Sequence, residues 1–407
     1  MKCRGYFLFT SLVTVLSFGH ILSLLATPAG FRWCCISEAE VSKCLHLANV
    51  TSHQIARFAR VTCIHGSNVT NCINMVGSGN ADFITLGQKN IYQAGSKHGL
   101  VPVVAEDYGK HEEGLESYSV ALIQSNLSDG ATMNSLKDRK SCHPAAGDAV
   151  GWTAPVGLLI GRGVIQWDGC NPYQSSGEYF DQSCVPGALS TEYNPQNSNP
   201  MSLCAICTNQ KTCPRNVSER YFGYHGAYRC LTEGPGDVAF VSHLTVFELT
   251  GVENGLNPGR DFKLLCLDGT RTDVGAFQQC NLARIPSRVV MTRPGSMVKS
   301  LKQWLLRLDE YCRTNPHFFQ MFNSSTYGGK DLLFADSTVK LIDVKEKNTT
   351  QAWLGEKYYF ALQSLSSCPE VLAVSRSLTV RLKPRGTGKF ISIEFITVVL
   401  TLYCCLT

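Results

Sequence analysis

Charged residues are scarce in this sequence. They make up 17% of its 407 residues, and the formal net charge is only +5. The Lys and Arg residues are scattered and form no basic stripe, which argues against a nucleic-acid partner. The near-balanced charge also argues against an acidic polymer that gathers calcium. Because 44% of the residues are hydrophobic, we predict a globular protein, and the length suggests two or three compact units.

Internal repeats and catalytic motifs are also absent. No period of about 20 to 50 residues recurs, which excludes a solenoid. The sequence has no G-x-S-x-G elbow and no H-E-x-x-H motif, and its C-x-x-C at Cys204 to Cys207 lies in a loop rich in cysteine and turn residues, 184–213. We therefore predict that the protein is not an enzyme and uses no cofactor.

Cysteine, by contrast, is abundant, with 19 residues. Such a number predicts either many metal clusters or an oxidised, extracellular framework. The N-terminus favours the second, because Lys2 and Arg4 precede a mostly apolar run, Tyr6 to Leu25, that small residues follow. This pattern predicts a signal peptide over residues 1–30 and a secreted protein, with a membrane anchor as the alternative. Between that segment and the tail, 16 cysteines remain, an even number suited to pairing.

Two further features bear on glycosylation and on attachment to the cell surface. Six N-x-S/T sequons without an intervening proline predict a glycoprotein in which these positions face solvent. They begin at Asn49, Asn68, Asn126, Asn216, Asn323 and Asn348. The tail, residues 369–407, ends in the apolar run Phe390 to Leu406 after a basic stretch, which predicts either a removable GPI signal attached near Ser375 or Ser377 or an unstructured end.

Between the two ends, short β-like runs alternate with longer amphipathic stretches, which is the pattern of an α/β protein. The strands are expected at 81–86, 100–105, 117–123 and 237–241. Residues 300–313 carry apolar side chains at the three-four spacing of a helix with one buried face. The loop 184–213 is expected to rely on disulfides rather than on regular structure.

Ordered motifs over most of the chain resemble one lobe of the transferrin family. The motifs include Arg32-Trp33-Cys34, Pro102 to Glu106, Lys140 to His143 with Gly151-Trp152, Ser183 to Pro186, Tyr221 to Cys230, Gly236 to Phe240 and Leu264 to Asp268. Three more stretches, which begin at Phe318, Lys330 and Ala352, are most similar to the N-lobe of melanotransferrin. The resemblance runs from about Phe31 to Cys368.

The resemblance implies an α/β lobe of two subdomains, like a periplasmic binding protein, with a cleft between them and two antiparallel crossing strands as a hinge. The lobe would span 31–368, with subdomain one at about 31–115 plus 241–368 and subdomain two at about 116–240. The implied disulfides are Cys34–Cys72, Cys44–Cys63, Cys142–Cys230, Cys184–Cys207, Cys204–Cys213, Cys266–Cys280 and Cys170–Cys368. Cys35 and Cys312 are left over, and they either pair with each other or link to a second chain.

In this family an Asp, two Tyr and a His bind ferric iron together with a carbonate, because anionic oxygens suit a hard trivalent cation. The resemblance places the Asp at Gly87, which has no side chain, and the first Tyr at Ser117. Tyr118 cannot substitute, because neighbouring residues of a strand point to opposite faces. The second Tyr and the His are retained as Tyr224 and His243. Two of the four protein ligands therefore remain.

The anion site implied by the resemblance is also altered. A Thr, an Arg and a helix N-terminus hold the carbonate in the family, and the Thr and Arg correspond to Pro144 and Asp148 here. Proline lacks the hydroxyl and the backbone N–H, and the carboxylate replaces a cation. We predict that high-affinity ferric iron binding is lost. Either Tyr224 and His243 merely pack in the cleft, or they form a weak divalent site with Asp148.

A single secreted lobe without its iron ligands is similar to the otolith matrix proteins of fish. The resemblance implies a structural glycoprotein of the otolith matrix, with an otolin-like collagenous protein and calcium carbonate as partners. The carboxylates of Asp107, Glu112, Glu113 and Glu116 would then either contact calcium or form a solvated charged loop. The alternatives are a GPI-anchored, melanotransferrin-like cell-surface protein and a carrier with a rewired weak metal or anion site.

Overall fold

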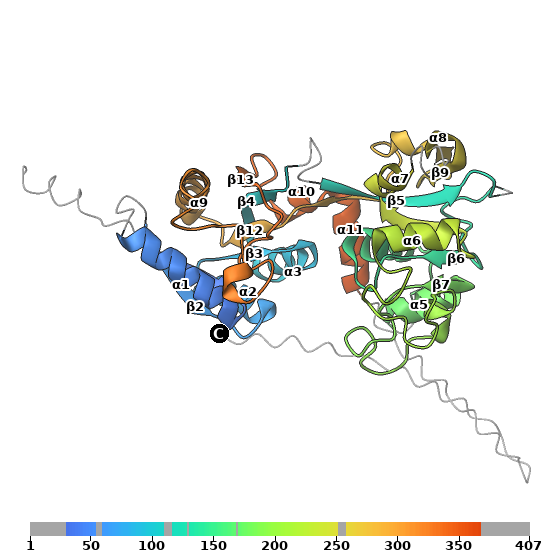
Figure 1. Ribbon diagram of the computed structural model, residues 1–407, viewed down its shortest axis with the longest axis horizontal. Helices are drawn as coiled ribbons and strands as arrows, with labels where there is room; N and C mark the ends of the chain where they lie inside the picture. The colour runs from blue at the N-terminus through green and yellow to red at the C-terminus, as the bar shows by residue number, and fades with distance from the viewer. Residues whose placement is uncertain are drawn as a thin grey trace, which may run out of the picture. The chain divides into compact units, whose positions relative to one another are not determined.

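The computed structural model describes residues 30–53, 59–109, 116–127, 130–167, 170–250 and 258–367 (Figure 1). The strands are β1 (Phe31–Cys35), β2 (Val61–His65), β3 (Phe83–Leu86), β4 (Val101–Asp107), β5 (Glu116–Gln124), β6 (Lys140–Cys142), β7 (Gln182–Cys184), β8 (Val238–Ser242), β9 (Phe262–Leu265), β10 (Arg271–Thr272), β11 (Ala283–Pro286), β12 (Val289–Thr292) and β13 (Lys340–Asp343).

Helices alternate with these strands. The α-helices are α1 (Glu38–His53), α2 (Val69–Gly77), α3 (Gln88–His98), α4 (Ala154–Gly161), α5 (Pro172–Tyr179), α6 (Gly223–Thr232), α7 (Leu244–Leu249), α8 (Pro258–Asp261), α9 (Met297–Thr314), α10 (Thr350–Leu354) and α11 (Glu356–Ser366). A π-helical turn, η2 (Ala149–Thr153), leads into α4, and short 3-10 helices are η3 (Met201–Cys204), η4 (Val274–Ala276) and η5 (Ser325–Tyr327). The alternation confirms the predicted α/β class.

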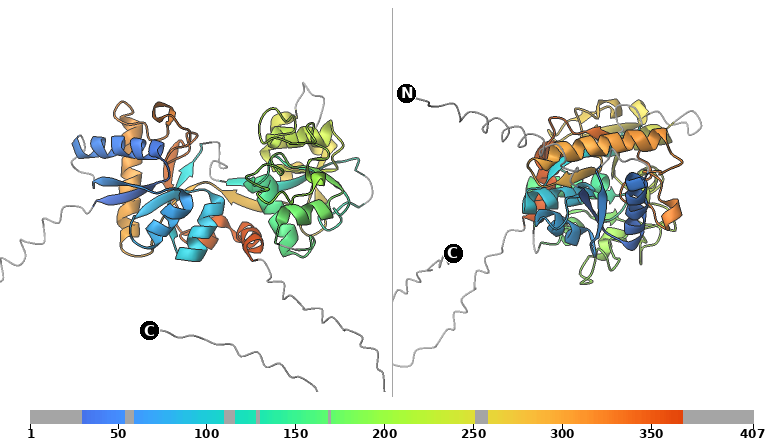
Figure 2. Two further views of the ribbon diagram at one scale, coloured as in Figure 1. Left: turned by 90° about the horizontal axis from the view of Figure 1, so that it is seen from below. Right: turned by 90° about the vertical axis from the view of Figure 1, so that its left-hand side faces the viewer.

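The first sheet has the strand order β13-β4-β12-β3-β1-β2. β1 pairs in parallel with β2 and β3, whereas β12 runs antiparallel to both β3 and β4. Every residue of β3 is buried, as expected of an apolar strand that is covered on both faces. Figures 1 and 2 show α1 and α9 beside this sheet. The predicted helix at 300–313 is α9, which buries Leu301, Trp304, Leu305 and Leu308.

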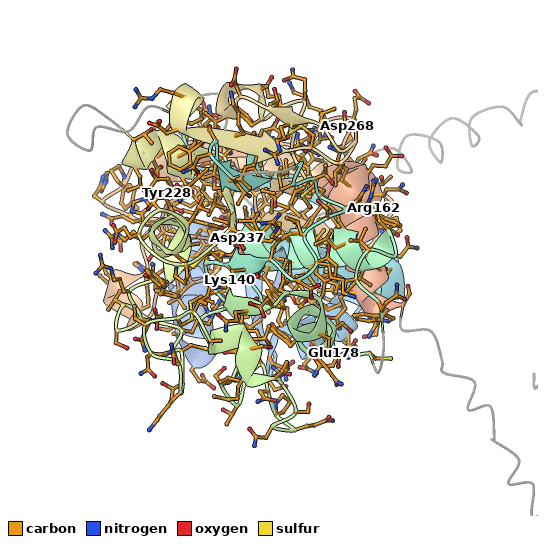
Figure 3. The ribbon with its side chains drawn as sticks, turned by 90° about the vertical axis from the view of Figure 1, so that its right-hand side faces the viewer. Lys140, Arg162, Glu178, Tyr228, Asp237 and Asp268 are labelled. Atoms are coloured by element: carbon orange, nitrogen blue, oxygen red, sulfur yellow. A yellow bond between two sulfur atoms is a disulfide. The ribbon has the colours of Figure 1, made fainter. Side chains whose placement is uncertain are left out.

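The second sheet has the order β10-β9-β5-β8-β6-β7, and β11 pairs with β5 beside this path. Figure 3 views the protein from the side that carries the second sheet and labels Lys140 and Asp237. The Lys140 backbone N–H at the start of β6 donates to the Asp237 carboxylate at 2.8 Å. Two antiparallel pairs connect the sheets, since β4 pairs with β12 in the first and β5 pairs with β11 in the second.

The two sheets divide the chain differently from the predicted subdomains on one side. The sequence assigned everything after residue 240 to the first subdomain, but β9, β10 and β11 lie in the second sheet. β9 pairs antiparallel with β5 over Ala121 to Gln124. The chain therefore stays with the second sheet until about Pro286 and returns to the first with β12. The sheet to which β9 belongs is decided by its pairing with β5, which lies more than a hundred residues earlier in the chain. Local sequence patterns carry no signal for such a pairing.

The C-terminal helix α11 packs against α4 of the second part of the lobe. The approach depends on Gly157, where an added Cβ would lie 2.5 Å from the backbone oxygen of Ala361. α4 suits this buried position because all but its last residue are buried. The last described helix, α11, is therefore packed directly against α4, the helix that follows η2.

Six of the seven implied disulfides are present among the described residues. They join Cys34 to Cys72, Cys44 to Cys63, Cys142 to Cys230, Cys184 to Cys207, Cys204 to Cys213 and Cys266 to Cys280. Cys170 is also disulfide-bonded, and its implied partner Cys368 lies outside the described residues. Cys35 and Cys312 are free and buried, so they form no disulfide with each other here. The loop 184–213 contains only β7's last residue and η3 as regular structure.

None of the helices in the described part of the chain combines the length and apolar character needed to cross a bilayer. The predicted signal peptide, 1–30, lies outside the described residues except for Gly30. The tail 369–407 with its GPI hypothesis also lies outside them.

Candidate functional site

A cavity of about 680 Å³ opens at the antiparallel strands that connect the two sheets. Its walls come from the start of α3, the start of β5, the turn η2, the start of α6, the end of β11 and α11. The lining residues are Gln88, Lys89, Tyr108, Glu116, Ser117, Gly147, Asp148, Ala149, Val150, Thr153, Arg215, Tyr224, Leu244, Ile285, Pro286, Ser287, Ser337 and Tyr358. Four of the positions that the sequence singled out line this cavity: Glu116, Ser117, Asp148 and Tyr224.

Of the two positions without an iron ligand, Ser117 lines this cavity and Gly87 directly precedes the lining residue Gln88. Gly87 is the N-cap of α3 and provides no side-chain acceptor, and a Cβ built there meets nothing within 4 Å. Ser117 lines the cavity, and its hydroxyl lies 3.0 Å from that of Ser242. Tyr118 points elsewhere, with its ring 5.3 Å from that of Phe277. The alternation of the strand therefore keeps Tyr118 from replacing the missing ligand, as the sequence predicts.

Asp148 holds the N-terminal amides of the helix that begins with η2. It is the N-cap, and its Oδ1 accepts hydrogen bonds from the backbone N–H groups of Val150 at 3.0 Å and Gly151 at 2.7 Å. The hydroxyl of Tyr224 donates to both carboxylate oxygens at 3.2 Å. A helix N-terminus attracts anions through these free N–H groups. Here the carboxylate of the chain itself occupies them.

This arrangement changes the chemistry of Tyr224. Burial, and then the charge and hydrogen bond of Asp148, raise the pKa of the Tyr224 phenol well above its ordinary value. Burial also raises the pKa of Asp148, while its hydrogen bonds from Gly151, Tyr224 and Val150 act in the opposite direction. A tyrosine must lose its proton to bind a ferric ion, so the contact with Asp148 opposes the role that the resemblance gives to Tyr224.

Pro144 completes the altered anion site. It is buried, and an added Cβ on Gly151 would lie 2.2 Å from its Cδ. The backbone N–H of Gly223, at the start of α6, donates to the Pro144 carbonyl at 2.8 Å. The proline ring thus packs against the helix start, and the same carbonyl holds the segment that carries Tyr224.

His243 does not join Tyr224 and Asp148. Its Nδ1 accepts a hydrogen bond from the Tyr118 backbone N–H at 3.2 Å, and its ring lies 4.3 Å from that of Phe277. The residues that line the cavity do not include it. The structure therefore brings together Asp148 and Tyr224, but not His243. The weak three-ligand site considered for these residues is not assembled here, because His243 packs with aromatic rings.

The predicted acidic cluster is neutralised where the structure describes it. Glu116 forms ion pairs with Arg284 and with Lys347, the latter at 2.8 Å. Asp107 lies 3.6 Å from the ammonium of Lys340 and accepts the Gly109 N–H. Glu112 and Glu113 lie outside the described residues. The described carboxylates favour ion pairing over a free calcium site.

The asparagines of the six sequons are all exposed, as the sequence predicts for glycosylation positions.

Near the disulfide loop, Cys184, Cys207 and Glu219 lie close enough together to suggest a metal site. The two sulfur atoms are already joined to each other, so this group is a disulfide with a carboxylate beside it. The same loop explains the C-x-x-C motif, since Cys204 and Cys207 pair with different cysteines.

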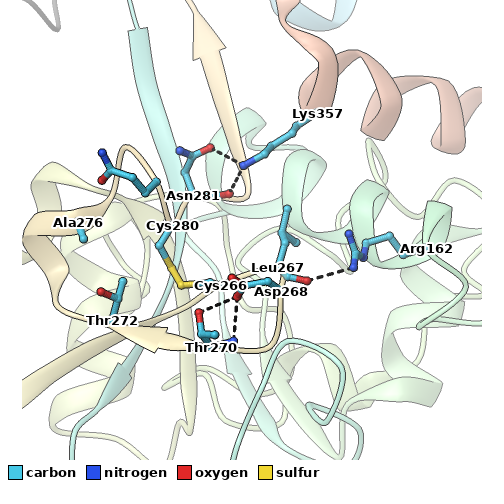
Figure 4. Close-up of a pocket in the computed structure, with 11 residues that line it drawn as sticks. Arg162, Cys266, Leu267, Asp268, Thr270, Thr272, Ala276, Cys280, Asn281 and Lys357 are labelled. Atoms are coloured by element: carbon cyan, nitrogen blue, oxygen red, sulfur yellow. Dashed lines mark hydrogen bonds between the residues drawn. A yellow bond between two sulfur atoms is a disulfide. The ribbon is translucent and has the colours of Figure 1, made fainter.

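A second cavity of about 590 Å³ lies beside the Cys266–Cys280 disulfide (Figure 4). Its two nearby cations already have partners. Arg162 donates to the Leu267 carbonyl at 3.1 Å, and Lys357 donates to the Asn281 carbonyl at 2.8 Å. Carbonyl groups of the fold therefore already hold both of these cations.

The two-sheet lobe, with a cavity at its connecting strands, has the architecture of a single transferrin-like lobe. The Transferrin family model matches residues 31–367, and the chain belongs to this family. It is 38% identical to human melanotransferrin over 84% of this chain and 47% of that protein. It is 35% identical to otolith matrix protein 1 of Danio rerio and 36% to that of Oncorhynchus mykiss, over 86% of this chain in both and 96% and 95% of those proteins. The chain thus spans about half the length of the melanotransferrins that it matches.

Sequence reasoning did not find several residues of this cavity. Tyr358, Ser287, Lys89 and Arg215 line it, but they come from α11, the β11–β12 connection, α3 and the segment after the disulfide loop. No local motif joins these segments. Only the fold brings them to one cavity.

Proposed function

We propose that this protein is a secreted structural glycoprotein of the otolith organic matrix that supports otolith growth and calcium carbonate mineralisation. The match with otolith matrix protein 1 over nearly the full length of that protein supports the proposal. The disulfide framework and six exposed sequon asparagines suit an extracellular scaffold. Its partners would be an otolin-like collagenous protein and the mineral, and its working part would be the outer surface.

The loss of ferric iron binding belongs to the same proposal, and one observation carries it. Asp148 binds the helix amides and the Tyr224 hydroxyl together. The anion site is thereby filled from within, and the one cavity tyrosine that the family pattern retains is held in its protonated form. Gly87 and Ser117 add no ligand. The proposal includes a non-catalytic role, which agrees with the lack of catalytic motifs in the sequence.

Two experiments test this proposal. One adds ferric iron and bicarbonate to the purified protein, where we expect no visible charge-transfer band and no iron after dialysis; a stable coloured complex would refute the loss of iron binding. The other searches demineralised otoliths for peptides of the protein by mass spectrometry. Their absence from otoliths, together with expression outside the inner ear, would refute the matrix role.

Two other functions remain as alternatives. A GPI-anchored, melanotransferrin-like cell-surface protein is favoured by the similarity to melanotransferrin, and it predicts release of the protein from membranes by a phosphatidylinositol-specific phospholipase. A carrier with a rewired cleft is favoured by the size of the cavity, and it predicts a thermal shift when its ligand is added.

A further inference from the structure

Two buried hydroxyl groups at the cleft cavity lack a hydrogen-bond partner among the residues that the structure describes. Tyr358 on α11 is 1% exposed and Ser287, between β11 and β12, is 3% exposed. Both residues line the cavity, and within the described part of the chain Tyr358 Oη and Ser287 Oγ are unpaired. Buried hydroxyls are normally satisfied by protein or by a ligand. These two groups therefore form a polar floor that lacks its partner.

The charged groups around this floor are unevenly compensated. The carboxylate of Asp148 accepts hydrogen bonds from two amides and from Tyr224. Glu116 is paired with two cations. Lys89 and Arg215 also line the cavity and are exposed at its rim, and neither forms an ion pair within the described ranges. Neutral donors leave the charge of Asp148 in place, so the lining itself holds two carboxylates and two cations. The two cations that pair with Glu116, Arg284 and Lys347, add further positive charge beside the cavity. Positive charges around the cavity therefore outnumber negative ones.

We propose that this cavity binds a small organic anion with several carboxylate or hydroxyl oxygens, of the size class of a tricarboxylate. Lys89 and Arg215 attract and hold its carboxylates at the rim, and Tyr358 and Ser287 hydrogen-bond to its inner end. The volume of about 680 Å³ lies within the range of about 300 to 1,000 Å³ for small-molecule sites. The site does not use the helix N-terminus, because Asp148 holds those amides. This binding activity goes beyond the matrix role and does not depend on it.

Citrate is the probe for this proposal, and titration calorimetry on the full chain at low ionic strength is the assay. We expect saturable binding of one citrate per chain. Tyr358→Phe removes one hydroxyl and should weaken binding about 2- to 10-fold. Lys89→Gln should weaken it about 2- to 5-fold.

Matched controls come from the same two helices. Lys97 is exposed on α3 and Tyr359 follows Tyr358 on α11, and neither lines the cavity. Lys97→Gln and Tyr359→Phe should therefore leave citrate affinity unchanged. Circular dichroism and thermal unfolding check that each variant folds, and Ser287→Ala gives a second, smaller change on the floor if Tyr358→Phe does not fold.

The outcomes separate a built site from general attraction to a positive protein. Two results together support the proposal. Inorganic phosphate binds more weakly than citrate at equal ionic strength, and citrate affinity falls in Lys89→Gln but not in Lys97→Gln. No saturable citrate binding overturns it. Equal effects of Lys89→Gln and Lys97→Gln, or an unchanged affinity in both floor variants, also overturn it.

Discussion

The contact between Asp148 and the helix amides gives a quantitative prediction for Asp148→Ala. Alanine removes an N-cap, which typically costs about 1 kcal/mol. It also removes the acceptor of the Tyr224 hydroxyl, and a hydrogen bond to a charged group contributes roughly 1.5–3 kcal/mol. The variant no longer bears the desolvation cost of a partly buried carboxylate, and water can enter from the cavity. Both effects offset part of this loss. We expect the free energy of unfolding to fall by about 2–3 kcal/mol at pH 7.

Asp148→Asn is the matched variant, because asparagine is as good an N-cap as aspartate. Its amide oxygen can still accept the Val150 and Gly151 N–H groups, and the Tyr224 hydroxyl can turn to accept from its amide nitrogen. We expect a loss below about 1 kcal/mol. Urea unfolding followed by fluorescence measures both variants with the disulfides intact. A loss for alanine no larger than that for asparagine would refute the proposed role of the carboxylate.

The pH dependence of the same pair gives an independent check. Burial raises the pKa of Asp148 in the folded protein above its unfolded value of about 3.9. A carboxyl of this kind contributes stability that is fully present below the unfolded pKa and is lost as pH rises through the folded pKa. The stability of the wild type relative to Asp148→Asn should therefore decrease from pH 4 upward. A constant or increasing difference would contradict the direction of the shift.

Three further changes test the fold. Gly157→Ala places a Cβ 2.5 Å from a backbone oxygen of α11 and should lower the free energy of unfolding in urea by about 1–3 kcal/mol. In the control variant Gly275→Ala the added Cβ meets nothing within 4 Å, so its stability should change by no more than about 0.5 kcal/mol. Equal effects of the two changes would contradict the close helix packing. Gly87→Asp adds a capping side chain to α3 and should raise stability by about 0.3–1 kcal/mol, and a lower melting temperature would contradict the open space at that site. Replacing Cys142 and Cys230 by alanine opens a loop of 88 residues and should cost roughly 4–5 kcal/mol in the chain-entropy view; a loss under 1 kcal/mol would argue against it.

Much of the framework could be predicted from the sequence. Strands such as β3 and β8 are continuous apolar runs, and α9 has a clear helical period, so these elements are visible in local patterns. The ordered motifs identified the lobe and implied the cysteine pairs. They also located the altered cleft positions, because glycine at 87 and serine at 117 lack a metal ligand whatever the surrounding fold.

Only the tertiary structure decided how the altered cleft is built. The sequence indicated that a carboxylate at Asp148 replaces a cation, but the fold shows that this carboxylate occupies the helix amides itself and accepts a hydrogen bond from Tyr224. It placed His243 against aromatic rings and away from that pair, and it assigned β9–β11 to the second sheet. The physical reason is the same in each case. Hydrogen bonds and packing between segments far apart in the chain set the direction of a side chain, and no local period records them.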